Sequence, residues 1–193
     1  MTVAIPEWTK EGVLPPTGQD PLSMDRSPYQ VSLLDVVGRF ATNTKRREIL
    51  EGFLRYRAVL HEAGLVAGFQ WIDGSFAEHV ESLQQRVPED IDVVTFYRRP
   101  TGVLPPALLE RLVRLFSRDT ETREHILAEF KVDGYPVDLA LPAPVLVEKA
   151  TYWYGLWSHR RDRSWKGYLE LSLAPEEDGE AMKLLADHRQ EVT

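Results

Sequence analysis

The sequence lacks cysteine altogether, so none of its 193 residues can form a disulfide or offer a thiolate to a metal ion. It also has no apolar run of about 18 residues and no basic segment that leads into an apolar one. We therefore expect neither a transmembrane helix nor a secretory leader, and we expect the protein to reside in the cytoplasm.

Several familiar types of site are absent from the sequence as well. The glycine patterns of Walker and Rossmann nucleotide sites do not occur. The five histidines are scattered without the spacing of a zinc site, and Ser75 lacks the Gly-x-Ser-x-Gly elbow of many serine hydrolases. The formal net charge of −7 argues against a wholly basic surface that coats nucleic acid, although it leaves room for a local basic patch.

The composition is that of a folded protein. Hydrophobic residues make up 43% and charged residues 27%, which predicts a real core and argues against global disorder. The length suits a single domain. We divide this domain into an N-terminal strap at 1–42, a core at 43–142 and a C-terminal extension at 143–193.

The first part of the strap is irregular and rich in proline. One interpretation is a frayed tail. The other is an ordered segment that lies across the domain, because Ile5, Trp8, Val13 and Leu14 give it apolar anchors.

The apolar periodicity predicts an α+β fold, with a nucleotidyltransferase-like mixed sheet flanked by helices and no internal repeat. The helix at 43–64 is the clearest element, since its apolar residues recur at steps of four and three. Asn43 or Thr44 is suited to cap its start. The other expected elements are helices at 75–85, at 106–116, from 144 and from 175, and strands at 69–72, 91–97, 126–132, 135–141 and 168–173. Asp133-Gly134 reads as the turn of a hairpin between two of those strands.

Two carboxylates stand at the start of one predicted strand. Asp90 and Asp92 are two residues apart, so in a strand they point to the same face, with Cα atoms about 7 Å apart. Two like charges beside an apolar strand repel each other, and a divalent cation removes that conflict. Mg²⁺ prefers oxygen ligands and is usually shared between carboxylates and substrate phosphates. Alone, the pair is equally compatible with a solvated strand start.

A glycine-serine turn precedes this pair. Gly74 allows a close approach of the backbone to a ligand, and Ser75 begins a predicted helix whose free N–H groups attract phosphate. Ser75 and Glu78 also have the spacing of a capping box, so a purely structural role for the turn is the alternative.

A third carboxylate, Asp138, lies among apolar residues of a later predicted strand. A carboxylate in such surroundings is costly unless it is paired or ligated. If the predicted hairpin extends the sheet, Asp138 stands beside Asp90 and Asp92 and completes a metal site. The alternative is a hairpin residue paired with a cation such as Lys131.

The C-terminal extension carries a basic stretch from Arg160 to Lys166 beside three of the five tryptophans. The stretch is either a solvated loop or a phosphate contact, for which Lys166 is the candidate residue. We expect Trp153, Trp157 and Trp165 to serve as core or interface residues rather than as platforms for bases.

These motifs together resemble the DNA polymerase beta-like nucleotidyltransferase superfamily. Its hallmark is an apolar strand that ends in Gly-Ser, then a helix, then Asp-x-Asp on a strand and a third acidic residue on a later strand. The matching residues are Ile72, Gly74, Ser75, Asp90, Asp92, Val93 and Asp138, within about residues 65–142. The spacing from Ser75 to Asp90 is slightly longer than usual, and Asp73 is not part of the hallmark.

Over nearly the whole chain the sequence is similar to a group of small stand-alone bacterial nucleotidyltransferase-like proteins. The residues that carry this similarity include Gly12 to Pro16, the Arg46-Arg47-Glu48 helix and Lys166-Gly167. The group is poorly characterised, so the resemblance says more about fold than about substrate.

The resemblance implies an enzyme that uses Mg²⁺ or Mn²⁺ and moves an NMP group from a nucleoside triphosphate such as ATP to a hydroxyl acceptor. Asp90, Asp92 and Asp138 would be both the catalytic and the metal-binding residues, and Gly74, Ser75 and Lys166 would bind phosphate. The acceptor would be a protein, an RNA or a small molecule, and no membrane is expected to take part. Some relatives in the superfamily are antitoxins that adenylylate a partner toxin. The alternative is a non-catalytic module on the same fold that neutralises a partner protein.

Overall fold

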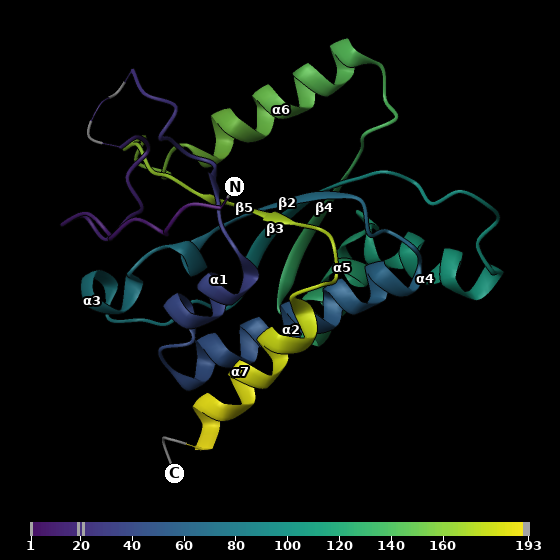
Figure 1. The fold of residues 1–193 in the computed structure, drawn as a ribbon, viewed down its shortest axis with the longest axis horizontal. Coiled ribbons are helices and arrows are strands. Elements are labelled where there is room, and N and C mark those ends of the chain that lie inside the picture. The colour runs from purple at the N-terminus through teal and green to yellow at the C-terminus, as the bar shows by residue number, and fades with distance from the viewer. Residues whose placement is uncertain (1, 19, 21, 191–193) are drawn as a thin grey trace.

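The computed structural model describes residues 2–18, 20 and 22–190 (Figure 1). These residues form a five-stranded mixed sheet and seven α-helices, which confirms the α+β class. The strands are β1 (Tyr29–Gln30), β2 (Gly68–Asp73), β3 (Ile91–Tyr97), β4 (Val132–Asp138) and β5 (Leu169–Ser172). The helices are α1 (Leu33–Phe40), α2 (Thr44–Glu62), α3 (Val80–Gln84), α4 (Pro106–Leu115), α5 (Thr120–Phe130), α6 (Ala143–Trp157) and α7 (Asp178–Gln190). A short 3₁₀ helix, η1 (Ser75–Ala77), follows β2. None of these described helices is long and apolar enough to cross a membrane.

The strand order is β1-β5-β2-β3-β4. β2 runs antiparallel to both β3 and β5, whereas β1 is parallel to β5 and β4 is parallel to β3. The end of β2 therefore lies beside the starts of β3 and β4, at one edge of the sheet. This arrangement brings residues from three strands to a single place.

The two faces of the sheet are covered very differently. Residues such as Ile72 and Val93 pack into a large core with α1, α2, α4, α5 and α7. Their neighbours Trp71 and Val94 point the other way, into a smaller aromatic cluster closed by α6. Figure 1 shows α6 alone on its side of the sheet, with the other long helices on the opposite side.

The prediction of a helix from Asn43 is confirmed. The side chain of Asn43 accepts a hydrogen bond from the backbone N–H of Arg46, as an N-cap residue should. Ile49, Phe53 and Tyr56 are fully buried, so the apolar face read from the sequence is the face that packs on the sheet.

The predicted hairpin at Asp133-Gly134 is wrong. Residues 120–130 form α5, which Asp119 caps by accepting a hydrogen bond from the Thr122 N–H. Ile126 and Phe130, read as strand residues, are buried at helical spacing. The chain then enters β4 directly and pairs in parallel with β3.

The predicted helix at 75–85 is broken. It consists of η1 and the five-residue α3, because Glu78 adopts an extended conformation with φ −104° and ψ 156°. The expected capping box is also wrong, since no side chain caps η1 and the Glu78 carboxylate binds cations elsewhere.

A buried arginine connects α2 to the C-terminal helix. The Arg57 side chain is 1% exposed and donates to Asp178 of α7 and to Gln70 of β2. It also donates to the backbone carbonyl at the end of β5 and to that of Ala174 just after it. Every one of these acceptors would lose its partner if the guanidinium were removed.

We predict that Arg57→Ala lowers the free energy of unfolding by about 3–5 kcal/mol, because it leaves a buried charge and several acceptors unpaired. Urea denaturation measures this loss. Arg55→Ala in the same helix is the matched control, since Arg55 is exposed and makes one hydrogen bond to the Glu129 carbonyl, and its effect should stay within about 0.5 kcal/mol. Equal losses in the two variants would contradict the prediction.

Candidate functional site

Four carboxylates meet at the edge of the sheet where β2 ends and β3 and β4 begin. Asp73 lies directly opposite Asp92, and Asp92 lies opposite Asp133. Residues at matching positions on neighbouring strands point to the same face, so these three side chains lie side by side. Asp90 precedes β3 by one residue and lines the same cavity.

The cavity has a volume of about 800 Å³, and we call it the site cavity. It lies on the face of the sheet that carries α6, and the end of α6 forms one wall. Its main polar lining residues are Asp73, Ser75, Glu78, Arg86, Glu89, Asp90, Asp92, Asp133, His159, Arg160, Arg161, Asp162 and Lys166.

The site cavity brings together most of the residues expected from the sequence. Gly74, Ser75, Asp90, Asp92 and Lys166 all line it, although they come from separate parts of the chain.

Asp138 does not join them, so the expectation that three predicted carboxylates share one cleft is wrong for this residue. It lies opposite Tyr97 at the far end of β4, five residues along the ladder from Asp92 and therefore about 17 Å away. There it forms an ion pair with Arg99 at 2.5 Å, so it is a paired carboxylate, although its partner is not Lys131.

Asp133 occupies the position that sequence reasoning assigned to Asp138. Asp-Gly between two apolar runs is a strong turn signal, and this pattern conceals Asp133 as a strand residue. In the fold, Gly134 is a strand residue instead, and a Cβ there would meet the Tyr56 hydroxyl at 2.6 Å. The signal that indicates Asp133 is its place at the start of a strand. Because that strand, β4, pairs in parallel with β3, Asp133 lies level with Asp92.

Gly74 allows the tight turn after β2 to lie directly against the carboxylate of Asp92. Its φ is +80°, and a Cβ there would come within 2.0 Å of Oδ2 of Asp92. Any other residue would therefore strain the backbone and displace the carboxylate.

Ser75 lines the site cavity, but it does not begin a long helix. η1 has three residues and α3 begins only after His79, so the helix dipole expected to attract phosphate is not developed here. What remains for a ligand is the Ser75 hydroxyl and the backbone of the turn.

Lys166 is buried and engaged within the protein. Its Nζ lies 2.8 Å from Oδ2 of Asp73 and 3.2 Å from Oε1 of Glu78, and only 5% of the residue is exposed. Arg160 donates to the other Glu78 oxygen at 2.7 Å. Burial alone would lower the pKa of Lys166, but Asp73 and Glu78 raise it above its usual value. Within the basic stretch, Arg161 is the exposed cation that lines the cavity.

The carboxylates of the site repel one another. Burial, followed by the charges of Asp73, Asp90 and Asp133, raises the pKa of Asp92 to about 7, and Lys166 offsets this only in part. Burial also raises the pKa of Asp73 to about 6 and is the main cause of the raised pKa of Asp90.

The donor set suits a hard divalent cation such as Mg²⁺ or Mn²⁺, because it consists of carboxylate oxygens with a net excess of negative charge. Asp90, Asp92 and Asp133 are the residues that would hold it. In the described part of the chain, no three histidine or acidic side chains already stand in the geometry of a metal centre.

Two parts of the structure hold the segment after β2 in place. Arg46, fully buried in α2, donates to the carbonyls of Phe76 and Glu78 and pairs with Glu81. This anchor fixes the backbone on which Ser75 and Glu78 are carried.

The N-terminal strap is the second support, and its residues 3–17 are ordered rather than frayed. The Trp8 indole donates to the Ala77 carbonyl at 2.9 Å and stacks on His79 with ring centroids 4.4 Å apart. Further along, the carbonyl of Gly12 accepts from His79, and that of Leu14 accepts from Gly167. The strap therefore binds the residues next to Glu78 and to Lys166, on both sides of their ion pair.

The tryptophans of the C-terminal extension follow the core interpretation in two of three cases. Trp153 and Trp157 are 7% and 6% exposed in the aromatic cluster under α6, whereas Trp165 is 57% exposed. Trp165 packs against the His159 ring, with centroids 4.1 Å apart, and lies outside the core.

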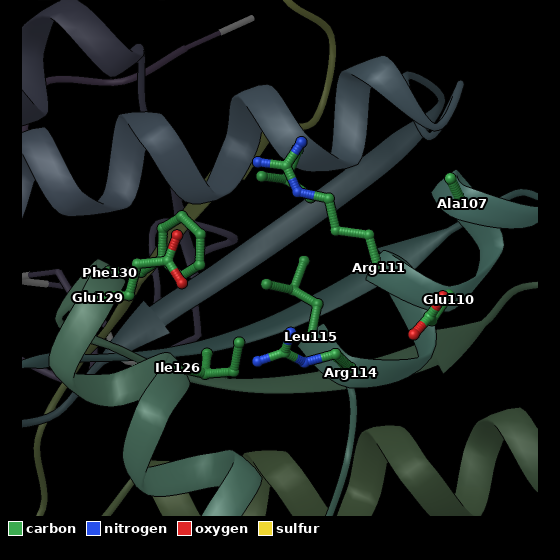
Figure 2. Close-up of a pocket in the computed structure, with 9 residues that line it drawn as sticks. Ala107, Glu110, Arg111, Arg114, Leu115, Ile126, Glu129 and Phe130 are labelled. Carbon is green, nitrogen blue, oxygen red and sulfur yellow. The ribbon is translucent and has the colours of Figure 1, made fainter.

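A second hollow of about 320 Å³ lies between α2, α4 and α5 (Figure 2). Its floor is apolar, from Leu115, Ile126 and Phe130, and charged side chains of α4 form its rim. It contains no group of neighbouring carboxylates, so the site cavity is the better candidate for chemistry.

Gly74→Ala should destabilise the protein by more than about 1 kcal/mol, because alanine is strained at positive φ and its methyl group collides with Asp92. Thermal unfolding measures the change. Gly38→Ala in α1 is the control: a Cβ at Gly38 meets nothing within 4 Å, so helix propensity should stabilise that variant by about 0.5–1 kcal/mol. A Gly74 variant as stable as the wild type would show that the turn tolerates a side chain.

Asp92→Asn should stabilise the metal-free protein near neutral pH. Since the folded state raises the pKa of Asp92 to about 7, it binds a proton more tightly than the unfolded state does. Wild-type stability should therefore fall as the pH rises from about 4 to 7, and the variant should lose that part of the dependence.

Unfolding with EDTA across this pH range measures the effect. The expected gain at pH 8 is at least about 1 kcal/mol, since one pKa unit corresponds to about 1.4 kcal/mol. Asp138→Asn, which removes a carboxylate paired with Arg99, should bring no such gain. Parallel pH curves for wild type and Asp92→Asn would contradict the repulsion described above.

Comparison with known proteins places most of this architecture in one family. Residues 6–172, from the strap to the end of β5, match the model of DUF6932, which is described as a family of unknown function. No curated protein and no solved structure matches the chain. Because the match covers well over half of the sequence, the chain belongs to the DUF6932 family.

Proposed function

We propose that this protein is a metal-dependent nucleotidyltransferase, which transfers the NMP group of a nucleoside triphosphate to a hydroxyl acceptor. The observation that carries the proposal is the meeting of Asp90, Asp92 and Asp133 beside the Gly74-Ser75 turn in one cavity. Phosphoryl-type transfer depends on positioning and charge stabilisation more than on covalent chemistry, so it needs this combination of carboxylates and a phosphate cradle.

Each residue has a role that follows from its place. Asp90 and Asp92 would hold the cation, which when bound would neutralise phosphate charge and polarise the reacting phosphorus. Ser75 donates its hydroxyl to a phosphate oxygen, and Arg161, exposed in the cavity lining, offsets the remaining charge. Lys166 acts indirectly, since its ammonium group is held by Asp73 and Glu78.

Asp133 takes the role that the sequence assigned to Asp138. It lies level with Asp92, where it would also help to hold the cation, and it can accept the proton of the acceptor hydroxyl. The acceptor oxygen then bonds to the α-phosphorus, the bond from that phosphorus to the bridging oxygen breaks, and pyrophosphate leaves. Whether the acceptor is a protein, an RNA or a small molecule stays a prediction, as does the expected location in the cytoplasm.

A specific observation favours a second candidate, a non-catalytic module that binds and neutralises a partner protein. Two of the four carboxylates already have internal cations: Arg123 pairs with Asp133, and Lys166 pairs with Asp73. α6 also exposes Val147, Tyr152 and Leu156, which are apolar side chains suited to protein contact.

Binding of Mn²⁺ or Mg²⁺ with a nucleoside triphosphate should raise the melting temperature by several degrees. Ligand at about 100 times its dissociation constant stabilises the fold by about 2.7 kcal/mol, and each kcal/mol is worth about 2–4 °C in a domain of this size. Mn²⁺ should act at least as strongly as Mg²⁺. Differential scanning fluorimetry with ATP, GTP, CTP and UTP measures the shift, and transfer of label from each α-labelled triphosphate to protein, RNA and small-molecule acceptors tests the reaction.

Asp90→Asn with Asp92→Asn should abolish both the shift and the transfer, because asparagine keeps the volume and loses the charge. Asp133→Asn should abolish transfer, whereas Asp138→Asn should leave it unchanged, since Asp138 lies at the other end of β4. A wild-type protein that responds to no metal and nucleotide pair would favour the partner-binding module instead.

A further inference from the structure

Asp73 is the carboxylate of the site cavity that the resemblance does not explain. It ends β2 immediately before the Gly74 turn, and it is 2% exposed although it lines the cavity. A buried carboxylate is costly unless both of its oxygens have partners, so each oxygen of Asp73 should bind a donor or a cation.

One oxygen of Asp73 has a partner within the protein. Oδ2 lies 2.8 Å from Nζ of Lys166, which Glu78 holds from its other side and which is itself buried. Arg160 in turn holds Glu78. This chain of ion pairs fixes the orientation of the Asp73 carboxylate.

The other oxygen of Asp73 has no such partner among the described residues. Oδ1 is buried and receives no hydrogen bond from the described residues, while the backbone N–H of Gly74 lies close enough to the carboxylate to offset part of the rise in its pKa. An acceptor fixed by Lys166 on one side and unpartnered on the other is arranged as metal-ligating carboxylates are, since these are usually oriented by an outer hydrogen-bond partner.

The position of Asp73 points to the same ligand as its neighbours. It lies directly opposite Asp92. Because Gly74 has no side chain, the Asp92 carboxylate has room beside the turn that follows Asp73. A neutral ligand group would leave the charge of Asp92 uncompensated, whereas a divalent cation with oxygen ligands compensates it.

We propose that Asp73 is a further cation ligand of the site, which binds a hard divalent ion through Oδ1 together with Asp92, while Lys166, Glu78 and Arg160 position it. This inference rests on the cation of the proposed function and adds a ligand from β2 to those from β3 and β4. The ion-pair chain behind Asp73 is a positioning device and does not touch the cation.

The test is the affinity for Mn²⁺ alone, measured by isothermal titration calorimetry and by the loss of the free Mn²⁺ signal in electron paramagnetic resonance. Asp73→Asn should weaken Mn²⁺ binding by more than about tenfold, since the loss of even a hydrogen-bond partner behind a metal ligand typically costs about 10–100-fold. Glu78→Gln is the matched control, because it disturbs the same ion-pair chain but leaves Oδ1 of Asp73 in place, and it should change the affinity much less. Asp138→Asn, a carboxylate removed outside the cavity, should change nothing.

The outcomes separate this inference from the proposed function. Mn²⁺ binding that needs Asp92 but is unaffected by Asp73→Asn would overturn the role of Asp73 and leave the proposed function standing. Equal weakening by Asp73→Asn and Glu78→Gln would reduce Asp73 to a positioning residue and overturn the proposal. A wild-type protein that binds no Mn²⁺ at all would overturn the proposed function as well. Circular dichroism of each variant identifies any loss of fold, and for a variant that does not fold Asp73→Ser takes its place with the same expected loss.

Discussion

The ion pair between Lys166 and Asp73 compensates a concentration of negative charge that the register of the sheet makes unavoidable. Three strands place Asp73, Asp92 and Asp133 side by side, and each carboxylate raises the cost of ionising the next. Lys166 reaches this cluster from the segment before β5, so the site is complete only when that distant segment has docked. The charge balance of the site therefore depends on the pairing of β5 with β2.

The residues that anchor the backbone of the site do not themselves line the site cavity. Arg46 of α2 binds the backbone of the segment after β2, and the strap binds both His79 and Gly167. These contacts use carbonyls and N–H groups that would otherwise be buried without partners, which makes the arrangement costly to disturb. The segments around the cavity are thus anchored from outside it, while the cavity lining keeps more acidic side chains than cationic ones.

The unequal covering of the sheet explains why the site lies where it does. Five helices on one face supply most of the buried apolar surface, and they include the Arg57 network that fastens α7. Among the described helices, α6 alone covers the other face, where it closes an aromatic cluster over the middle of the strands and ends at Trp157. Beyond that cluster the strand ends are left open as the site cavity. The larger core and the site cavity therefore lie on opposite faces of the sheet.

The sequence by itself determined the features that depend on residues close together in the chain. The periodicity and cap of α2, the two same-side carboxylates Asp90 and Asp92 and the need for glycine at position 74 were all readable from local patterns. The tertiary structure decided which distant residues join them. Asp133 replaced Asp138 because β4 pairs in parallel with β3 after a helical connection, a choice that the turn-like Asp-Gly pair concealed. Lys166 became a buried partner of Asp73 because β5 pairs with β2. Strand partners are chosen by the packing of whole elements, and no local pattern contains that information.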